Sequence, residues 1–308
     1  MSASDLFTFG EVMALFVATD TDSVVTAREY ALQVVGAEAN VAVAVSRLGL
    51  KSVLMSRVGR DQLGDVVIDE LRNEGVDVSR ITRVANSTGS MVRNGGTIQP
   101  VEISYLRTLS AASTMSPSDL MESDISQTRW VHATGISMAI SSTARETVNE
   151  ALRLARIAKV KISFDLNIRR KLWSEDQARE ALRETVHEMD VLFGGADEYQ
   201  VLWGMQSPEE NLARAAEVGV KTAILTAGAG TIRVLSGGIY WEIQPPIVEA
   251  VDPVGSGDAF VGATIAGLLS GMDMRDAIVQ GSQSGAKVAT QIGDWAGLPR
   301  GIGGVAGD

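Results

Sequence analysis

The sequence contains no cysteine and only two histidines, His132 and His187, among its 308 residues. The lack of cysteine excludes disulfides, thiolate metal ligands and thiol catalysis. The two histidines lie far apart and lack the spacing of metal ligands, which argues against a zinc centre or a Ser-His-Asp triad. Any catalytic function would therefore depend on other residue types.

Long apolar runs and an excess of basic residues are also lacking. No stretch of 18 uncharged apolar residues occurs, and the N-terminal segment MSASDLFTFGEVM has no basic start, so we expect a soluble, cytoplasmic protein. The 27 Lys and Arg against 38 Asp and Glu give a net charge of −11, which disfavours nucleic-acid and membrane partners. A small anionic ligand is still allowed, because a few arginines can make one pocket locally positive.

Aromatic residues make up only 5% of the chain, whereas hydrophobic residues make up 45%, most of them aliphatic. This balance is typical of Val, Ile and Leu strands covered by Ala-rich helices. The order of elements agrees, because strands and helices alternate as in a doubly wound α/β fold. We expect strands near 6–10, 52–57, 130–134, 161–165, 190–193, 222–226 and 243–251, and helices over 37–48, 61–73, 143–158 and 276–290, with a further helix after Pro253.

The segment 81–109 interrupts this alternation. Its short polar and apolar runs are split by Asn94-Gly95-Gly96, which predicts a hairpin set apart from the main sheet. Without internal repeats or a low-complexity linker, we expect one α/β domain over 1–308 with a small β appendage. The Gly-rich tail, 300–308, is predicted to be flexible.

The sequence Gly255-Ser256-Gly257-Asp258 lies where a Pro and Gly turn leads into an apolar helix. Glycines allow a ligand to approach the backbone, and the first amides of a helix have no intrahelical partner, so this junction can bind an anion. An Asp in that first turn could accept a hydroxyl proton beside a transferring phosphate. Equally, these residues could form only a tight turn with a favourable first-turn acid.

The usual nucleotide-binding motifs do not occur. GxxxxGK[ST] is absent, and Gly228-Ala229-Gly230 lacks the third glycine of GxGxxG. A phosphate-binding function, if present, must therefore use a different arrangement.

Two separated motifs resemble those of the ribokinase-like (PfkB) carbohydrate kinases. Residues 251–260 (VDPVGSGDAF) are similar to the C-terminal motif DTxGxGDxF, and residues 36–42 (GAEANVA) and 57–64 (RVGRDQLG) are similar to the N-terminal one. The resemblance extends to about Pro299. It implies a central, mostly parallel β-sheet flanked by helices, with a small β-sheet lid from segments of approximately 12–34 and 86–110, and ATP and Mg²⁺ as cofactors.

Several further strings resemble 2-keto-3-deoxygluconate kinases within that family, among them 105–107 (YLR) with 110–113 (SAAS), 132–137 (HATGIS), 165–169 (DLNIR) with 171–173 (KLW), and 293–299 (GDWAGLP). Together they favour a sugar acid over a neutral sugar, since guanidinium groups pair with carboxylates. The resemblance assigns Asp258 as catalytic base, with Gly255, Ser256 and Gly257 beside the phosphate. It places Gly36, Asn40, Tyr105, Arg107, Ile136 and Arg169 at the sugar acid, Thr226, Gly228, Gly230, Gly255, Gly257, Ser282 and Ala286 at the nucleotide, and Glu198 near Mg²⁺.

This sequence departs from the family pattern at four places. Val35 stands where a first glycine is usual, and Met91 replaces a tyrosine. The Asn-x-x-Glu motif reads GADE over 195–198, and KxGxxG reads TAGAGT over 226–231. The family also commonly pairs through the lid edge, which implies a homodimer.

The leading hypothesis is transfer of the ATP γ-phosphoryl group to the terminal hydroxyl of 2-keto-3-deoxygluconate or a close analogue. One alternative keeps the chemistry but changes the substrate to fructose or another neutral sugar. Another is a non-catalytic sugar or nucleotide sensor, given the altered motifs at 195–198 and 226–231. A nicotinamide-dependent oxidoreductase is disfavoured by the missing GxGxxG.

Overall fold

The computed structural model describes residues 4–95, 101–205 and 207–301. Contacts between Cα atoms divide the chain into two compact units. Unit 1 comprises residues 1–7 and 116–247, and unit 2 comprises residues 8–115 and 248–308. Strand β1 (Leu6–Phe9) crosses the boundary between them in sequence.

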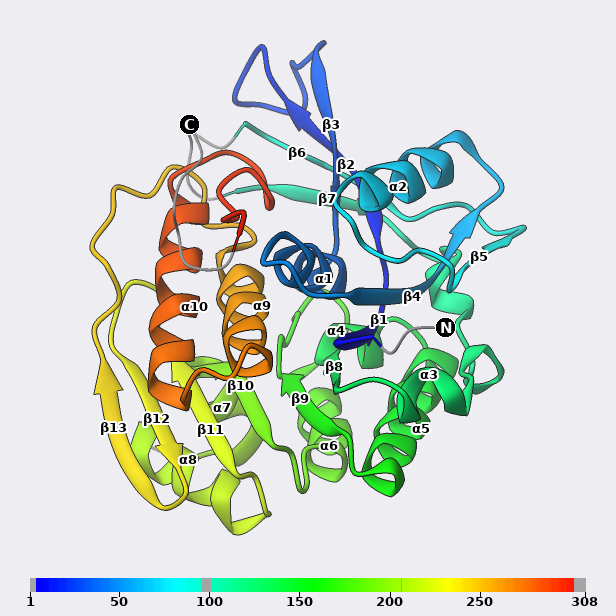
Figure 1. The fold of residues 1–308 in the computed structure, drawn as a ribbon. Helices are drawn as coiled ribbons and strands as arrows, with labels where there is room; N and C mark the ends of the chain where they lie inside the picture. Colours follow the sequence, from blue (N-terminus) through cyan, green and yellow to red (C-terminus); the bar gives the residue numbers. More distant parts are fainter. Residues whose placement is uncertain (1–3, 96–100, 206, 302–308) are drawn as a thin grey trace. The chain divides into compact units, whose positions relative to one another are not determined.

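Unit 1 is an α/β unit with parallel strands that alternate with helices (Figure 1). Its strands follow the order β13-β12-β11-β10-β9-β8, and pairs from β8 to β11 are parallel whereas β11-β12 and β12-β13 are antiparallel. The strands are β8 (Trp130–Thr134), β9 (Lys161–Asp165), β10 (Val191–Gly195), β11 (Thr222–Thr226), β12 (Ile232–Ser236) and β13 (Ile239–Ile243). The helices are α3 (Glu122–Ser126), α4 (Gly135–Ala139), α5 (Ser142–Ala158), α6 (Glu175–Thr185), α7 (Ala196–Trp203) and α8 (Pro208–Glu217).

Local sequence explains how the longer helices of unit 1 begin. The Ser141 hydroxyl accepts from the Ala144 N–H at 3.0 Å at the start of α5, and Ser174 accepts from Gln177 N–H at the start of α6. At the start of α8, Ser207 accepts from the Glu210 N–H and Pro208 occupies the first helical position. Such caps satisfy amides that have no partner inside a helix.

Unit 2 contains two groups of strands. Parallel strands β4 (Ser52–Gly59) and β5 (Ile81–Val84) pair with Ser56 opposite Ile81. A separate four-stranded sheet has the order β3-β2-β6-β7, built from β2 (Met13–Ala18), β3 (Tyr30–Val35), β6 (Ser90–Arg93) and β7 (Ile103–Leu106). The helices of unit 2 are α1 (Ala37–Arg47), α2 (Gln62–Asn73), α9 (Ser256–Leu269) and α10 (Met274–Ala289).

Helix α9 is apolar on all sides and packs between α1 and α10 (Figure 1). Two glycines permit this close packing. A Cβ on Gly262 would lie 2.6 Å from the Ala44 Cβ of α1, and one on Gly285 of α10 would lie 2.8 Å from the Ser256 carbonyl oxygen. A helix buried on every side cannot rotate without loss of contacts, so its N-terminus is held in a fixed position.

Most predicted helices and strands are confirmed within two residues at either end, and two predictions were wrong. Residues 81–84 belong to β5 and pair with β4, so only β6 and β7 form the predicted hairpin. The strand expected over 243–251 ends at Ile243. Pro245 and Pro246 have no N–H to donate to a sheet, and Ile247 is fully exposed.

The predicted α/β class and the small sheet over the expected lid segments are confirmed, whereas a single domain over 1–308 stays a prediction. Of the predicted hairpin turn, Gly96 lies outside the described residues, as do residues 302–308 of the predicted flexible tail.

Candidate active site

The N-terminus of α9 lies at the end of a tightly held turn. Gly255 has φ +81°, and a Cβ at this position would lie 2.8 Å from the Asp294 Cα. Gly257 is exposed, and a Cβ there would meet nothing within 4 Å. The first turn of α9 is therefore open on the Gly257 side and closed by protein on the Gly255 side, a shape in which an anion can reach the helix start.

The amides of this turn are not equally available. The Ser256 N–H donates to the Pro253 carbonyl oxygen at 3.3 Å, and the Ser256 hydroxyl donates to the same oxygen at 2.7 Å. A phosphate that used the Ser256 amide would have to compete with this carbonyl.

Asp258 is half-buried in the first turn of α9. Its Oδ2 accepts a hydrogen bond of 2.7 Å from the Asn40 side-chain nitrogen on α1. The same nitrogen donates to Asp294 Oδ2 at 2.7 Å, and the Asn40 oxygen accepts from Trp295 Nε1 at 2.7 Å. The predicted base thus lies beside a buried amide and a second carboxylate.

Arg107 follows β7 and belongs to a buried polar cluster. Its guanidinium forms an ion pair with Glu11, whose side chain is 1% exposed, and lies 5.6 Å from the centre of the Tyr105 ring. The Ser110 hydroxyl donates to Glu11 Oε1 at 2.5 Å. Burial raises the pKa of Glu11, while Arg107 and Ser110 oppose that shift.

Gly36 precedes α1 and lies against the same segment. A Cβ on Gly36 would lie 2.4 Å from the Glu11 carbonyl oxygen, so no larger residue fits without a shift of the backbone. Within unit 2 the structure thus places Asn40 at the Asp258 carboxylate, and it places Arg107 and Gly36 at Glu11.

In unit 1, Glu198 organises the ends of two strands. Its Oε1 accepts from the Ile168 N–H and its Oε2 from the Gly195 N–H, both at 2.7 Å. Burial is the main cause that raises the pKa of this carboxyl, and the two amides oppose it. Arg169 follows Ile168 and is exposed, so Glu198 fixes the backbone from which the Arg169 side chain extends.

The remaining predicted residues differ in exposure. Ile136 on α4 is half-buried, as are Thr226 at the end of β11 and Ala286 on α10. Gly228 and Gly230 are exposed, and Gly228 has φ +58°. Ser282 is 5% exposed, so it is less accessible to a nucleotide than Ala286.

Comparison with known proteins identifies the family of this chain. A family model described as pfkB family carbohydrate kinase matches residues 3–300. The chain belongs to the pfkB family of carbohydrate kinases.

Individual pfkB relatives agree over nearly the whole length. A 2-dehydro-3-deoxygluconokinase of Bacillus subtilis is 33% identical, with 96% of this chain and 92% of the relative covered. A 2-dehydro-3-deoxygalactonokinase of Haloferax volcanii is 32% identical, with 95% and 93% covered. A protein of E. coli described as ribokinase II, solved with ATP and Mg²⁺, has a TM-score of 0.88 and 28% identity over 96% of both chains. The ribokinase-like fold and the carbohydrate-kinase class expected from the motifs are confirmed, and neither the sensor nor the oxidoreductase alternative is favoured.

Four buried charged residues of unit 2 were not predicted individually from the sequence: Glu11, Arg93, Asp252 and Asp294. Asp252 and Asp294 lie inside strings that carry the resemblance, and only that proximity could have signalled them. Nothing in the sequence near Glu11 or Arg93 distinguishes a buried ion pair from an exposed charge.

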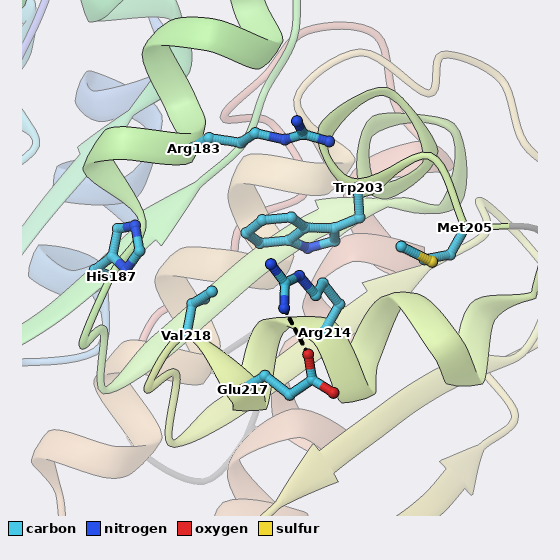
Figure 2. A pocket seen from close by; sticks show the side chains of 7 residues that line it. All are labelled: Arg183, His187, Trp203, Met205, Arg214, Glu217 and Val218. Atoms are coloured by element: carbon cyan, nitrogen blue, oxygen red, sulfur yellow. Dashed lines mark hydrogen bonds and ion pairs between the residues drawn. The ribbon is translucent and has the colours of Figure 1, made fainter.

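A surface pocket of unit 1 is lined by none of the predicted site residues (Figure 2). It has a volume of about 410 Å³ and contains Trp203, with the Arg214 guanidinium 5.9 Å from the ring centre. Figure 2 shows Arg183 and His187 on its other sides. His132 is likewise separate from the predicted site residues, because it is fully buried in β8 and bonds to Ser163 at 2.9 Å.

Membrane-spanning helices and metal-binding clusters were also considered for the described residues. In the ranges that the structure describes, no helix is both long enough and apolar enough to cross a bilayer. Among the same residues, no group of three His, Asp or Glu side chains could hold a metal ion.

Proposed function

We propose that this chain transfers the γ-phosphoryl group of ATP to the terminal hydroxyl of 2-keto-3-deoxygluconate, also named 2-dehydro-3-deoxygluconate, or of a close analogue. The observation that carries the proposal is the half-buried Asp258 carboxylate in the open first turn of α9, held by Asn40 at 2.7 Å. The names of the two relatives, both sugar-acid kinases, support the choice of substrate.

Asp258 acts as the general base. Its carboxylate takes the proton of the sugar hydroxyl as the hydroxyl oxygen bonds to the γ-phosphorus and the bond to ADP breaks. The N–H groups at the start of α9 stabilise negative charge on the transferring group. Gly257 suits this role, since the space beside it is open.

Arg107 is the main candidate to read the carboxylate of the substrate. Arginine has five N–H donors, so its pairing with Glu11 leaves donors for a ligand and fixes the orientation of the fork. Tyr105 covers one face of the guanidinium, and Gly36 lets the Glu11 backbone lie close to the start of α1. We propose further that Arg169 helps to orient the sugar acid and that Ile136 packs against the carbon chain of the substrate.

The nucleotide contacts are proposed for the exposed turn of Gly228 and Gly230, Thr226, and Ala286 and Ser282 on α10. Magnesium usually binds through phosphates and one or two carboxylates, so it needs no cluster of three acids. Both Glu198 oxygens already accept backbone N–H groups, which fits an indirect role rather than direct ligation. When bound, the ion neutralises charge on the phosphates.

We also propose a homodimer and a cytoplasmic location. The outer strand β3 carries Tyr30 and Leu32, which are 38% and 43% exposed, and the outer strand β7 carries Leu106, which is 63% exposed. Exposed apolar residues on edge strands favour pairing with a second copy. Light scattering coupled to size-exclusion chromatography tests the dimer, and a monomer at micromolar concentration would reject it.

The proposed reaction is tested by ADP release from purified protein with ATP, Mg²⁺ and a panel of sugars. We expect the highest kcat/KM with 2-keto-3-deoxygluconate or its C4 epimer, and a much lower value with fructose and ribose. A preference for a neutral sugar would reject the substrate, and no ADP release with any sugar would reject the reaction.

A further inference from the structure

Asn40 has its hydrogen-bonding groups committed inside the protein. Trp295 Nε1 can only donate, so the Asn40 oxygen must face it and the Asn40 nitrogen must face the carboxylates. That nitrogen has two N–H groups, and they go to Asp258 and Asp294. Asn40 is 2% exposed and has no N–H left for a sugar hydroxyl.

Asp294 is a second carboxylate at the base. It is 6% exposed and accepts from the same nitrogen as Asp258, at the same distance of 2.7 Å. The Asn40 amide therefore lies between two acidic groups and donates one N–H to each. Rotation of the amide by 180° would place its oxygen against both carboxylates and its nitrogen against the indole N–H, so only one orientation satisfies the cluster.

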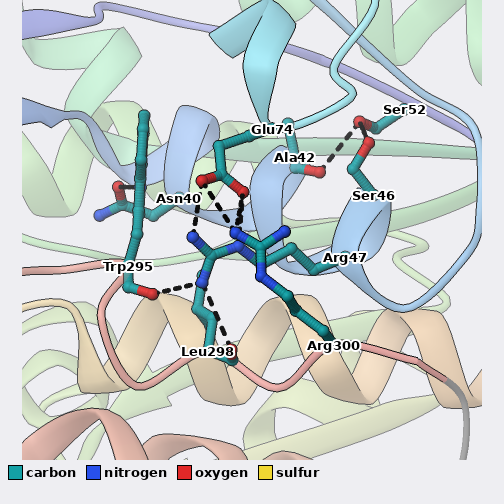
Figure 3. Close-up of polar contacts among 9 residues, drawn as sticks. All are labelled: Asn40, Ala42, Ser46, Arg47, Ser52, Glu74, Trp295, Leu298 and Arg300. Atoms are coloured by element: carbon teal, nitrogen blue, oxygen red, sulfur yellow. Dashed lines mark hydrogen bonds and ion pairs between the residues drawn. The ribbon is translucent and has the colours of Figure 1, made fainter. Parts of the chain in front are cut away.

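Trp295 is itself held from the opposite side (Figure 3). The Arg47 Nη1 donates to the Trp295 carbonyl oxygen at 2.5 Å and to the Leu298 carbonyl oxygen at 3.3 Å. Arg47 also binds Glu74 with two hydrogen bonds, from Nε at 2.5 Å and Nη2 at 2.7 Å. Bidentate pairing of this kind fixes the guanidinium plane, so the segment 293–299 is anchored to α1 and to the end of α2.

We propose that Asn40 is a positioning residue for the catalytic base, and that Trp295 and Asp294 set its orientation. This inference rests on the proposed function of Asp258. It differs from the role implied by the family resemblance, in which Asn40 contacts the sugar. The cluster holds Oδ2 of Asp258 at one point and thereby fixes the orientation of the carboxylate in the first turn of α9. A positioning role predicts a loss in kcat, whereas a sugar contact predicts a rise in KM for the sugar.

A double-variant cycle tests the coupling. Trp295→Phe removes one N–H and keeps an aromatic ring, and we expect kcat to fall roughly ten- to hundredfold with sugar KM changed less than about threefold. Asn40→Ala should lower kcat at least as much. In the Asn40→Ala background, Trp295→Phe should change kcat less than about twofold, because Trp295 acts only through Asn40. Trp203→Phe, outside this cluster, is the matched control and should leave kcat unchanged.

A second measurement does not depend on turnover. Exchange of the Asn40 side-chain N–H protons with solvent, followed by NMR, should be much slower than for the exposed Asn73 and should become fast in Trp295→Phe. Multiplicative losses in the cycle, a raised sugar KM with normal kcat in Asn40→Ala, or rapid exchange in the unmodified protein would each overturn the proposal. If the unmodified protein released no ADP with any sugar, the proposed function would fail, while the exchange measurement would still decide whether the cluster exists.

Discussion

The Arg93 guanidinium donates a hydrogen bond of 2.5 Å to the Asp252 carboxylate, and both side chains are fully buried. Asp252 also accepts from the Val254 N–H at 3.2 Å and the Gly293 N–H at 3.3 Å. The pair therefore ties β6 to the turn before α9 and to the segment that carries Asp294. Arg93 Nε and Nη1 are buried without a hydrogen-bond partner among the described residues. Asp252 is therefore the group that compensates the buried positive charge of Arg93.

Loss of Arg93 should destabilise the protein strongly. Arg93→Met leaves the Asp252 charge buried and unpaired, and we expect the free energy of unfolding to fall by about 3–5 kcal/mol. Urea denaturation followed by circular dichroism measures this. The double variant Arg93→Met with Asp252→Asn removes the buried charge and keeps an oxygen for one of the two amides, so it should recover part of the loss. Equal stability of the single and double variants would show that the unpaired charge is not the cause.

The two glycines at the start of α9 should respond differently to alanine. Gly255→Ala should lower the free energy of unfolding by at least about 1–2 kcal/mol, because φ is +81° and the new Cβ would collide with Asp294. Gly257→Ala should fold normally, since nothing lies near its Cβ. If phosphate binds there, however, Gly257→Ala should raise the KM for ATP. An unchanged KM for ATP in Gly257→Ala would argue against phosphate binding at this face.

Arg107 should distinguish sugar acids from neutral sugars. We expect Arg107→Ala to raise the KM for 2-keto-3-deoxygluconate by at least about tenfold, as loss of a hydrogen bond to a charged group costs about 1.5–3 kcal/mol. Because this variant leaves Glu11 buried and unpaired, Arg107→Ala with Glu11→Gln serves as the control for folding. A normal KM in a stable double variant would reject Arg107 as the carboxylate-binding residue.

His132 should make stability depend on pH. Burial lowers the pKa of His132 to about 3 from an ordinary value of 6.5, so below pH 6.5 the unfolded chain binds a proton that the folded chain does not. Above pH 6.5 the protonation of His132 does not affect the free energy of unfolding. Below pH 6.5 the free energy of unfolding falls by about 1.4 kcal/mol per pH unit. Between pH 7 and pH 5, the unmodified protein should lose about 2 kcal/mol more than His132→Asn in urea titrations. Parallel losses in the two proteins would contradict this. Glu11 and Glu198, whose pKa values are raised by burial, contribute with the opposite sign in both proteins and cancel in the comparison.

Much of the fold could be predicted from local sequence patterns. Helix α1 follows from the Ala-rich run that Gly49 ends, and α9 from the apolar run after Pro253 and Gly255. The strand expected over 243–251 shows the limit of such patterns, since apolar content suggested a strand where two prolines prevent one.

The candidate site could be predicted only in part. Asp258 and the glycines were found from the properties of one turn. The contacts of Asn40 with Asp258 and Asp294 join residues 218 and 254 positions apart, so no local pattern could reveal them. The same holds for Arg93 and Asp252, separated by 159 positions, because a sequence does not show which charges become buried together.

The central claim is that the Asp258 carboxylate removes the proton from the sugar hydroxyl. Asp258→Asn keeps the size of the side chain and removes the base, so turnover with 2-keto-3-deoxygluconate, ATP and Mg²⁺ tests it most directly. We expect kcat to fall by about 10²–10⁴-fold with the KM for the sugar changed little. A kcat within a few fold of the unmodified protein would contradict the assignment.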